Sequence, residues 1–248
     1  MGVDLDVMFA ATVTAEAAFA LPARLNSSPA VMAACTAFAR RAVDPEGHRW
    51  TWYERWPAIT APSSIVDAWA TPHLSAVALS GPPGLLWLRP DQIKISPGPR
   101  LAGFAADDEG CQLPIRRLCR ALARELGADR VMYLPDSGDW PSEVGDLFEV
   151  RFDDALARLT AWGPPVSTIG ALGYGKAVRS GYPYADGALR RPDGTPLSEA
   201  EIHPGGNRIY SGGVVTYYDG TLVPPDELAR PDLRGGFAYY IDDFGDLE

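Results

Sequence analysis

The sequence predicts an α+β fold in which a mostly antiparallel sheet carries about three helices, with a loop-rich β extension at the C-terminus. Alternating apolar residues near the start predict a half-buried strand, and three later segments have helical periodicity. Apolar runs joined by Gly- and Pro-rich turns at 74–89 and 214–223 predict hairpins, which favour antiparallel pairing. We expect one domain over residues 1–248, with an αβ body at 1–162 and a Gly/Pro-rich β extension at 163–248.

The first strand and the first helix are predicted from residues 3–42. Residues 3–13 alternate apolar and polar side chains, which is typical of a strand with one buried face. Ser27, Ser28 and Pro29 then supply an N-cap and a proline at the first helical position. Apolar residues follow at helical spacing, so the first helix is predicted over about 29–42.

The middle of the chain gives the clearest elements. Residues 115–126 place apolar side chains on one helical face and arginines on the rest, and Gly127 is expected to end this helix. Strands are predicted at 130–134 and 147–152, and a helix at about 153–162 with Asp153 as its cap. Around Gly81-Pro82-Pro83-Gly84, two apolar runs predict a hairpin whose loop is too long for a tight turn, and 93–95 predicts another short strand.

Two further regions are ambiguous in the sequence. The aromatic segment 50–56 is interpreted mainly as core, with a carbohydrate-stacking platform as the alternative. Short strands are predicted at 208–210, 214–218, 221–223 and 237–241. The run from Tyr217 to Thr221 predicts a type I′ hairpin turn, and the run from Arg191 to Thr195 predicts a second turn.

Charge is distributed unevenly along the chain. The net charge is −10, and residues 1–100 are neutral, so the whole excess of carboxylates lies after residue 100. This balance disfavours nucleic acid as a partner, because phosphates require Lys and Arg. The sequence shows neither a basic, apolar secretory start nor a run of about 20 apolar residues, so we expect a cytoplasmic protein with no membrane partner. The preference for Arg over Lys is typical of a GC-rich bacterial genome.

No motif predicts a cofactor or a metal. Asp4 and Asp6 form a DxD pair on the first strand, but no phosphate loop follows, so a solvated strand face is the preferred interpretation. The run 170–176 departs from both the P-loop and the dinucleotide fingerprint. The three histidines are scattered. Cys35 and Cys119 are expected to be buried, unreactive thiols.

A dense acidic stretch is the strongest candidate for a binding surface. Carboxylates around an aromatic side chain can attract a basic protein over long range and then bury the ring against it. The alternative is a solvated acidic surface that maintains solubility. The predicted partner-binding residues are Tyr133, Asp136, Asp139, Trp140, Glu143, Asp146, Asp153 and Asp154.

The run Cys119–Ser137 (CRALARELGADRVMYLPDS) is an amphipathic helix that leads into a strand and an acidic turn. In this respect the chain resembles the immunity proteins of bacterial polymorphic-toxin systems. The resemblance implies a non-catalytic protein that neutralises or regulates a basic partner by covering it. The alternative is an enzyme, a hydrolase or transferase, whose site is dispersed along the sequence.

Overall fold

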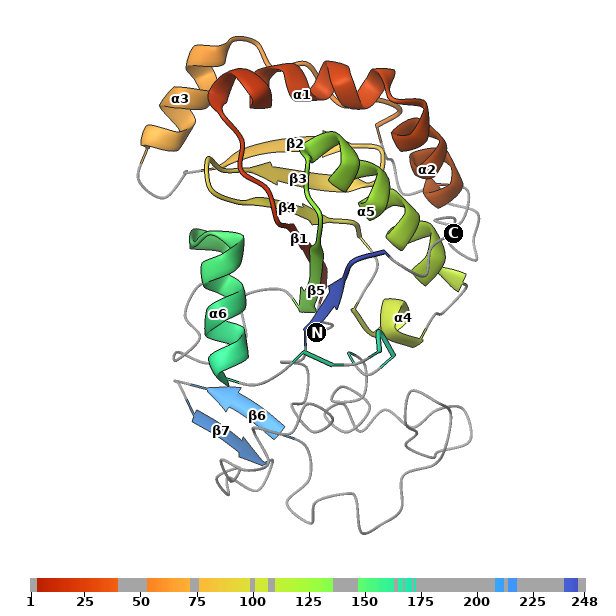
Figure 1. Cartoon of the computed structure of the whole chain (residues 1–248), viewed down its shortest axis with the longest axis vertical. Helices are drawn as coiled ribbons and strands as arrows, with labels where there is room; N and C mark the ends of the chain where they lie inside the picture. Colours follow the sequence, from red (N-terminus) through yellow and green to blue (C-terminus); the bar gives the residue numbers. More distant parts are fainter. Residues whose placement is uncertain are drawn as a thin grey trace.

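A six-stranded antiparallel sheet, with helices on both of its faces, forms the centre of the molecule (Figure 1). The strand order in this computed structural model is β2-β3-β4-β1-β5-β8, and β6 and β7 form a separate two-stranded sheet. The structure describes residues 4–39, 53–71, 76–98, 101–106, 110–135, 147–162, 165–166, 168–170, 172, 208–211, 214–217 and 239–244. The predicted α+β class and the antiparallel sheet are confirmed.

The strands of the large sheet are β1 (Leu5–Phe9), β2 (Val77–Gly81), β3 (Gly84–Leu88), β4 (Ile93–Ser96), β5 (Val131–Pro135) and β8 (Tyr240–Asp242). The small sheet pairs β6 (Arg208–Ser211) with β7 (Val214–Tyr217). The helices within the described residues are α1 (Ala15–Ser27), α2 (Pro29–Ala39), α3 (Pro62–Ala70), α4 (Leu101–Ala106), α5 (Gln112–Leu126) and α6 (Phe152–Trp162). The prediction of about three helices therefore missed α1, α3 and α4.

The central strands β1 and β5 are buried on both faces, because different helices cover the two sides. Leu5, Val7 and Phe9 point into a large core that α1, α2, α3 and α5 also line. Met8 and Met132 point the other way, into a smaller core with Leu159 and other residues of α6. Alternate side chains of these strands therefore lie in two different cores, instead of in one core and in solvent.

Helix α1 forms although the sequence pattern did not predict it. The Thr14 side chain accepts a hydrogen bond from the Ala17 N–H at 3.2 Å and so caps the helix, which continues through the internal Pro22. The cap predicted for the next helix is confirmed, since the Ser28 hydroxyl accepts from the Val31 N–H at 3.4 Å. Helix α5 ends as predicted, with Gly127 in the left-handed conformation at φ 71°.

The β2–β3 hairpin is tighter than the sequence suggested. Gly81 pairs with Gly84, so only Pro82 and Pro83 form the turn, and the prediction of a longer loop is wrong. A Cβ atom on Gly81 would lie 2.2 Å from the Trp56 ring, so glycine lets this buried indole pack on the strand. Trp56 thereby confirms the core interpretation of the aromatic segment at this residue.

The chain before α6 is not the strand predicted at 147–152. Residues Leu147–Glu149 form a single 3-10 turn, η3, and α6 then begins at Phe152. The Arg151 carbonyl accepts the first helical hydrogen bond, from the Ala155 N–H at 2.9 Å, so Asp153 lies inside the first turn instead of capping the helix.

Strand β8 comes from the C-terminal region and is held by a buried ion pair. The Asp242 carboxylate, 1% exposed, accepts from the Arg116 guanidinium at 2.6 and 3.0 Å. It also accepts from the backbone N–H of Phe244, whose φ of 62° is unusual for a residue with a side chain. The predicted strand at 221–223 and the turns at Tyr217–Thr221 and Arg191–Thr195 extend outside the described residues.

Candidate functional site: a charged pocket at the end of the sheet

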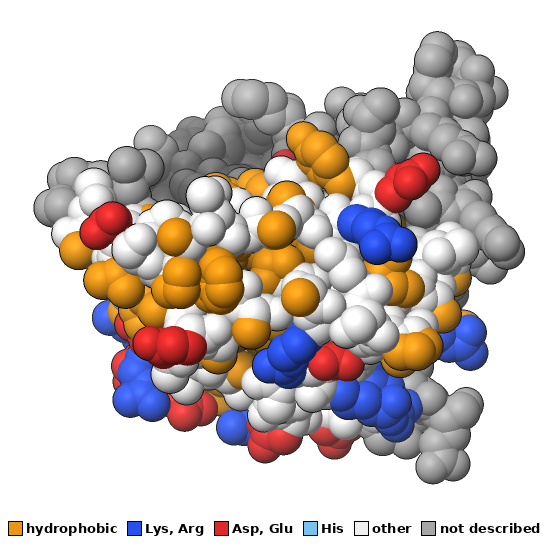
Figure 2. Space-filling view, turned by 90° about the horizontal axis from the view of Figure 1, so that it is seen from above, with side chains coloured by type: hydrophobic (Ala, Val, Ile, Leu, Met, Phe, Trp, Pro, Cys, Tyr) orange, Lys and Arg blue, Asp and Glu red, His pale blue; other side chains and the backbone are white. Residues whose placement is uncertain are grey.

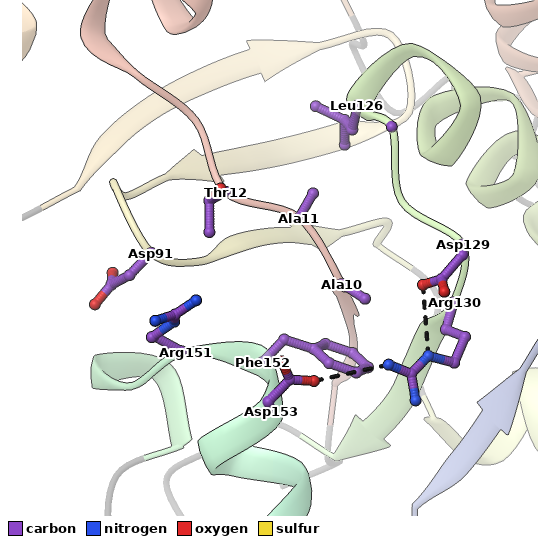
Figure 3. A pocket seen from close by; sticks show the side chains of 11 residues that line it. Ala10, Ala11, Thr12, Asp91, Leu126, Asp129, Arg130, Arg151, Phe152 and Asp153 are labelled. Atoms are coloured by element: carbon purple, nitrogen blue, oxygen red, sulfur yellow. Dashed lines mark hydrogen bonds and ion pairs between the residues drawn. The ribbon is translucent and has the colours of Figure 1, made fainter.

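A pocket of about 340 Å³ lies where β1 ends, beside the β3–β4 turn and the start of α6 (Figure 3). Short stretches that are distant in the sequence line it together: Ala10, Ala11, Thr12, Asp91, Leu126, Gly127, Asp129, Arg130, Arg151, Phe152 and Asp153. Three carboxylates and two guanidinium groups therefore share one cavity. The Phe152 ring lies between the two arginines in this view.

One side of the pocket holds Arg130 between two exposed carboxylates. Its Nε lies 3.4 Å from Asp129 Oδ1, and its Nη2 lies 3.7 Å from Asp153 Oδ1. The guanidinium carbon is also 5.8 Å from the centre of the Phe152 ring, within range of a cation–π interaction. The side chains of Asp129 and Asp153 are 78% and 76% exposed, so both have oxygens available to solvent or to a partner.

The other side of the pocket holds Arg151 and Asp91. The exposed Arg151 forms no ion pair with another described residue, whereas Asp91 lies 4.0 Å from Arg89 Nε. Arg151 also occupies the N-cap of α6, and its side chain has no acceptor for the free N–H groups of the first turn. Among the residues that the structure describes, this side therefore offers the Asp91 carboxylate, which lies beside Arg89, and the guanidinium of Arg151, which has no ion pair.

Gln92 fixes the geometry between the β3–β4 turn and α6. Its buried amide donates to the carbonyls of Leu147 and Val150 at 2.6 and 2.7 Å, which ties η3 to the turn. The Val13 N–H donates to the Pro90 carbonyl at 3.1 Å, and the Ala10 N–H donates to the Arg130 carbonyl at 3.0 Å. These hydrogen bonds hold the lining segments in one arrangement.

Of the predicted partner-binding residues, Asp153 and Asp154 are exposed in the first turn of α6, and Asp153 lines the pocket. Tyr133 is different, because it is fully buried in the large core and stacks on Phe104 with ring centroids 5.1 Å apart. Its proposed place on a binding surface is therefore wrong. The remaining predicted residues lie outside the described part of the chain: Asp136, Asp139, Trp140, Glu143 and Asp146.

The pocket also contains residues that the sequence did not single out. Asp129, Arg130 and Arg151 belong to the acidic stretch predicted over 129–154 but were not among its candidate binding residues, and the structure brings all three to the pocket. Asp91 comes from a different part of the chain. The position of Asp129 and Arg130 two and three residues after Gly127 was the available signal, because a helix end followed by a strand places such residues at the edge of a sheet.

Other candidate groups have structural roles. Asp6 is buried and bound to Lys94 at 3.1 Å and to the Ser96 hydroxyl, so the solvated-face interpretation fails for Asp6 and holds for the exposed Asp4. Burial raises the pKa of the Cys35 and Cys119 thiols to about 12, which keeps them protonated, as predicted. Within the described residues, no three His, Cys, Asp or Glu side chains converge as a metal site. The three histidines are not among these residues.

Comparisons with protein-family models, with curated proteins and with solved structures give no match to this chain. No helix in the described parts of the chain has the length and hydropathy needed to cross a bilayer.

Proposed function

We propose that the chain is a cytoplasmic, non-catalytic binding protein that neutralises or regulates a basic protein partner through the surface around the sheet-end pocket. The observation that carries this proposal is the pair of exposed carboxylates, Asp129 and Asp153, at the rim of a cavity. Both belong to the part of the chain that holds the entire net charge of −10. A toxin that an immunity protein covers would be a partner of this kind.

The electrostatics of the rim support a basic partner. Arg130 is balanced locally by Asp129 and Asp153. Arg151 adds one positive charge to the pocket, and Asp154 and Glu149 add two exposed negative charges beside it. Exposed ion pairs of this length contribute little to folding stability, about 0–1 kcal/mol each. A partner's Lys or Arg can therefore take over one of these carboxylates at small cost while long-range attraction accelerates its approach.

A structural role accounts for the exposed Asp153 and Asp154 but not for Asp129. Carboxylates in the first turn of a helix stabilise the helix dipole, which accounts for Asp153 and Asp154 without any partner. Asp129 precedes β5 and has no such helix to stabilise. Its exposure at the pocket rim is therefore the more specific support for binding.

The test compares two pairs of substitutions that change the net charge equally. Asp129→Asn with Asp153→Asn removes two charges at the pocket rim, and Glu16→Gln with Asp67→Asn removes two exposed charges from α1 and α3. With a labelled nona-arginine peptide as the probe, we expect the rim pair to slow association about tenfold at low salt and the control pair less than twofold. Equal effects would contradict the placement of the site. Turnover of a small molecule that is lost in Arg151→Gln would instead favour the enzyme alternative.

A further inference from the structure

Three arginines and a leucine form a stripe along the outer side of α5. They recur at intervals of four, three and four residues, so they lie within about 60° of the helix circumference and along about 16 Å of its length. Leu113 is 44% exposed, Arg117 and Arg124 are exposed, and Arg120 is half-buried. We call these four residues the α5 stripe.

The α5 stripe contains no carboxylate. Exposed helices are commonly stabilised by acidic and basic residues four apart, but the acidic residue of α5, Glu125, lies about 100° around the helix from Arg124 and pairs with Arg24 of α1 at 3.6 Å. Neither Arg117 nor Arg124 forms an ion pair with another described residue. The stripe is therefore a concentrated positive surface on a chain whose net charge is −10.

The neighbouring helices do not supply the missing carboxylates. Helix α2 packs against α5 and has no charged residue. Figure 2 looks down on α1, α2 and α3, and it shows hydrophobic side chains over the middle of this side, with most charged side chains toward its edges. Among the described elements beside α5, the stripe thus has little negative charge to balance it.

Carboxylates at the same spacing are the chemical complement of the α5 stripe. A guanidinium binds a carboxylate through two parallel N–H···O bonds, and it stays charged at every physiological pH. A helix with Asp or Glu at intervals of three and four residues presents them with the same axial rise as the stripe, so it can lie alongside α5. Leu113 offers an apolar contact about one turn beyond Arg117.

Two other occupants fit the stripe less well. A nucleic acid brings a continuous run of phosphates toward a chain with a net charge of −10, and a phosphate gains nothing from Leu113. A second copy that docked through its own α5 about a two-fold axis would place arginines against arginines. An acidic helix carries its charge along the stripe alone and can use the leucine as well.

We propose that the α5 stripe is the docking site for an acidic amphipathic helix of a protein partner. Carboxylates of that helix bind the arginines, and an apolar side chain packs on Leu113. The proposal is independent of the function proposed for the sheet-end pocket, because no residue of the stripe lines that pocket.

Peptide binding to the full chain tests the site. The probe is a labelled, alanine-rich helical peptide with glutamates and a leucine at the spacing of the stripe, and the control peptide has the same composition with its glutamates distributed around the helix. The patterned peptide should bind about tenfold more tightly than the control peptide, and its binding should weaken as salt rises. Equal affinities would overturn the proposal, and so would no binding of the patterned peptide at about 1 mM chain.

Substitutions in the chain provide a second comparison. Arg117→Gln with Arg124→Gln should raise the dissociation constant of the patterned peptide about tenfold. The matched control is Arg55→Gln with Arg158→Gln, which removes two charges from exposed residues elsewhere and should change that constant less than about twofold. Circular dichroism checks that each variant is folded, and equal losses in the two pairs would contradict the placement of the site.

A labelled single-stranded oligonucleotide separates a protein partner from a nucleic acid. We expect it to bind more weakly than the patterned peptide and to be insensitive to Leu113→Ser, which should weaken the peptide about threefold. Tighter binding of the oligonucleotide that is lost with Arg117→Gln and Arg124→Gln would overturn the proposal in favour of nucleic acid.

Discussion

The two faces of the six-stranded sheet are covered in different ways. On one face, α1, α2, α3 and α5 cover a large core whose buried side chains come from β1 to β5, with the partly buried Tyr240 of β8 packed against it. On the other face, α6 and η3 cover mainly β1 and β5, and the core there contains eight buried residues among those that the structure describes. Charge follows the same division, because the helices α1–α3 are almost uncharged outside while the start of α6 lies in a charged pocket.

The two faces therefore contribute differently to the stability of the chain. A wide apolar core supplies most of the burial that stabilises the chain, since burial of apolar surface contributes about 25 cal/mol per Å². The α6 face contributes less apolar burial and is held at its edge by the hydrogen bonds of Gln92. Substitutions that weaken the large core should therefore lower the stability of the whole chain, whereas substitutions on the α6 face should loosen mainly the neighbouring residues.

The largest effect is expected at the buried ion pair that fastens β8 beside β5. Arg116→Ala leaves the Asp242 carboxylate buried without its cation, so the free energy of unfolding should fall by about 3–5 kcal/mol. Arg117→Ala is the matched control, because Arg117 is the exposed neighbour and should cost less than about 0.5 kcal/mol. Urea titration measures both values, and equal losses would show that the ion pair does not stabilise β8.

A smaller and more local effect is expected on the α6 face. Gln92→Leu keeps the size of the side chain but leaves the carbonyls of Leu147 and Val150 without their donor, which should cost about 2 kcal/mol. Hydrogen exchange should accelerate in residues 147–162 and remain unchanged in α2 and α5. Gln112→Leu removes the hydrogen bond to the Ala105 carbonyl at 3.1 Å and serves as the control on the other face. Faster exchange throughout the chain would contradict the separation of the two faces.

The sequence predicted the fold class and much of its local structure, because these depend on neighbouring residues. Ser28, Gly127 and the periodic face of α5 act within one helix, and each prediction is confirmed. Helix α1 was missed because Pro22 and many alanines obscure its periodicity, although the cap at Thr14 was visible. The two-residue hairpin turn was missed because Gly81 and Gly84 were assigned to the loop, whereas they pair with each other at the ends of β2 and β3.

The candidate site was harder to predict because it depends on tertiary contacts. Tyr133 lies among acidic residues in the sequence, which suggested a surface position, but α6 and α5 cover both faces of its strand. The pocket joins residues near 10, 91, 129 and 152, and only the sheet order brings these segments together. Asp153 was identified correctly as exposed, since a charged residue at a helix start seldom becomes buried.

The smallest effect on stability is expected for the thiols of the large core. Their reactivity also reports how tightly that core is packed. Burial raises the pKa of Cys35 and Cys119 to about 12, so at pH 8 only about 10⁻⁴ of each is thiolate, against roughly a quarter for an ordinary thiol. Cys111 is only half buried, with its Sγ 3.4 Å from the Gly103 carbonyl. In single-cysteine variants, Ellman's reagent should therefore label Cys111 at least about a thousandfold faster than Cys119.

Gln92→Leu should leave the Cys119 rate unchanged because it loosens only the α6 face. Arg116→Ala should raise that rate because it frees β8 beside the core. Native Cys119 that reacts as fast as Cys111 would show that this face opens far more readily than its packing implies.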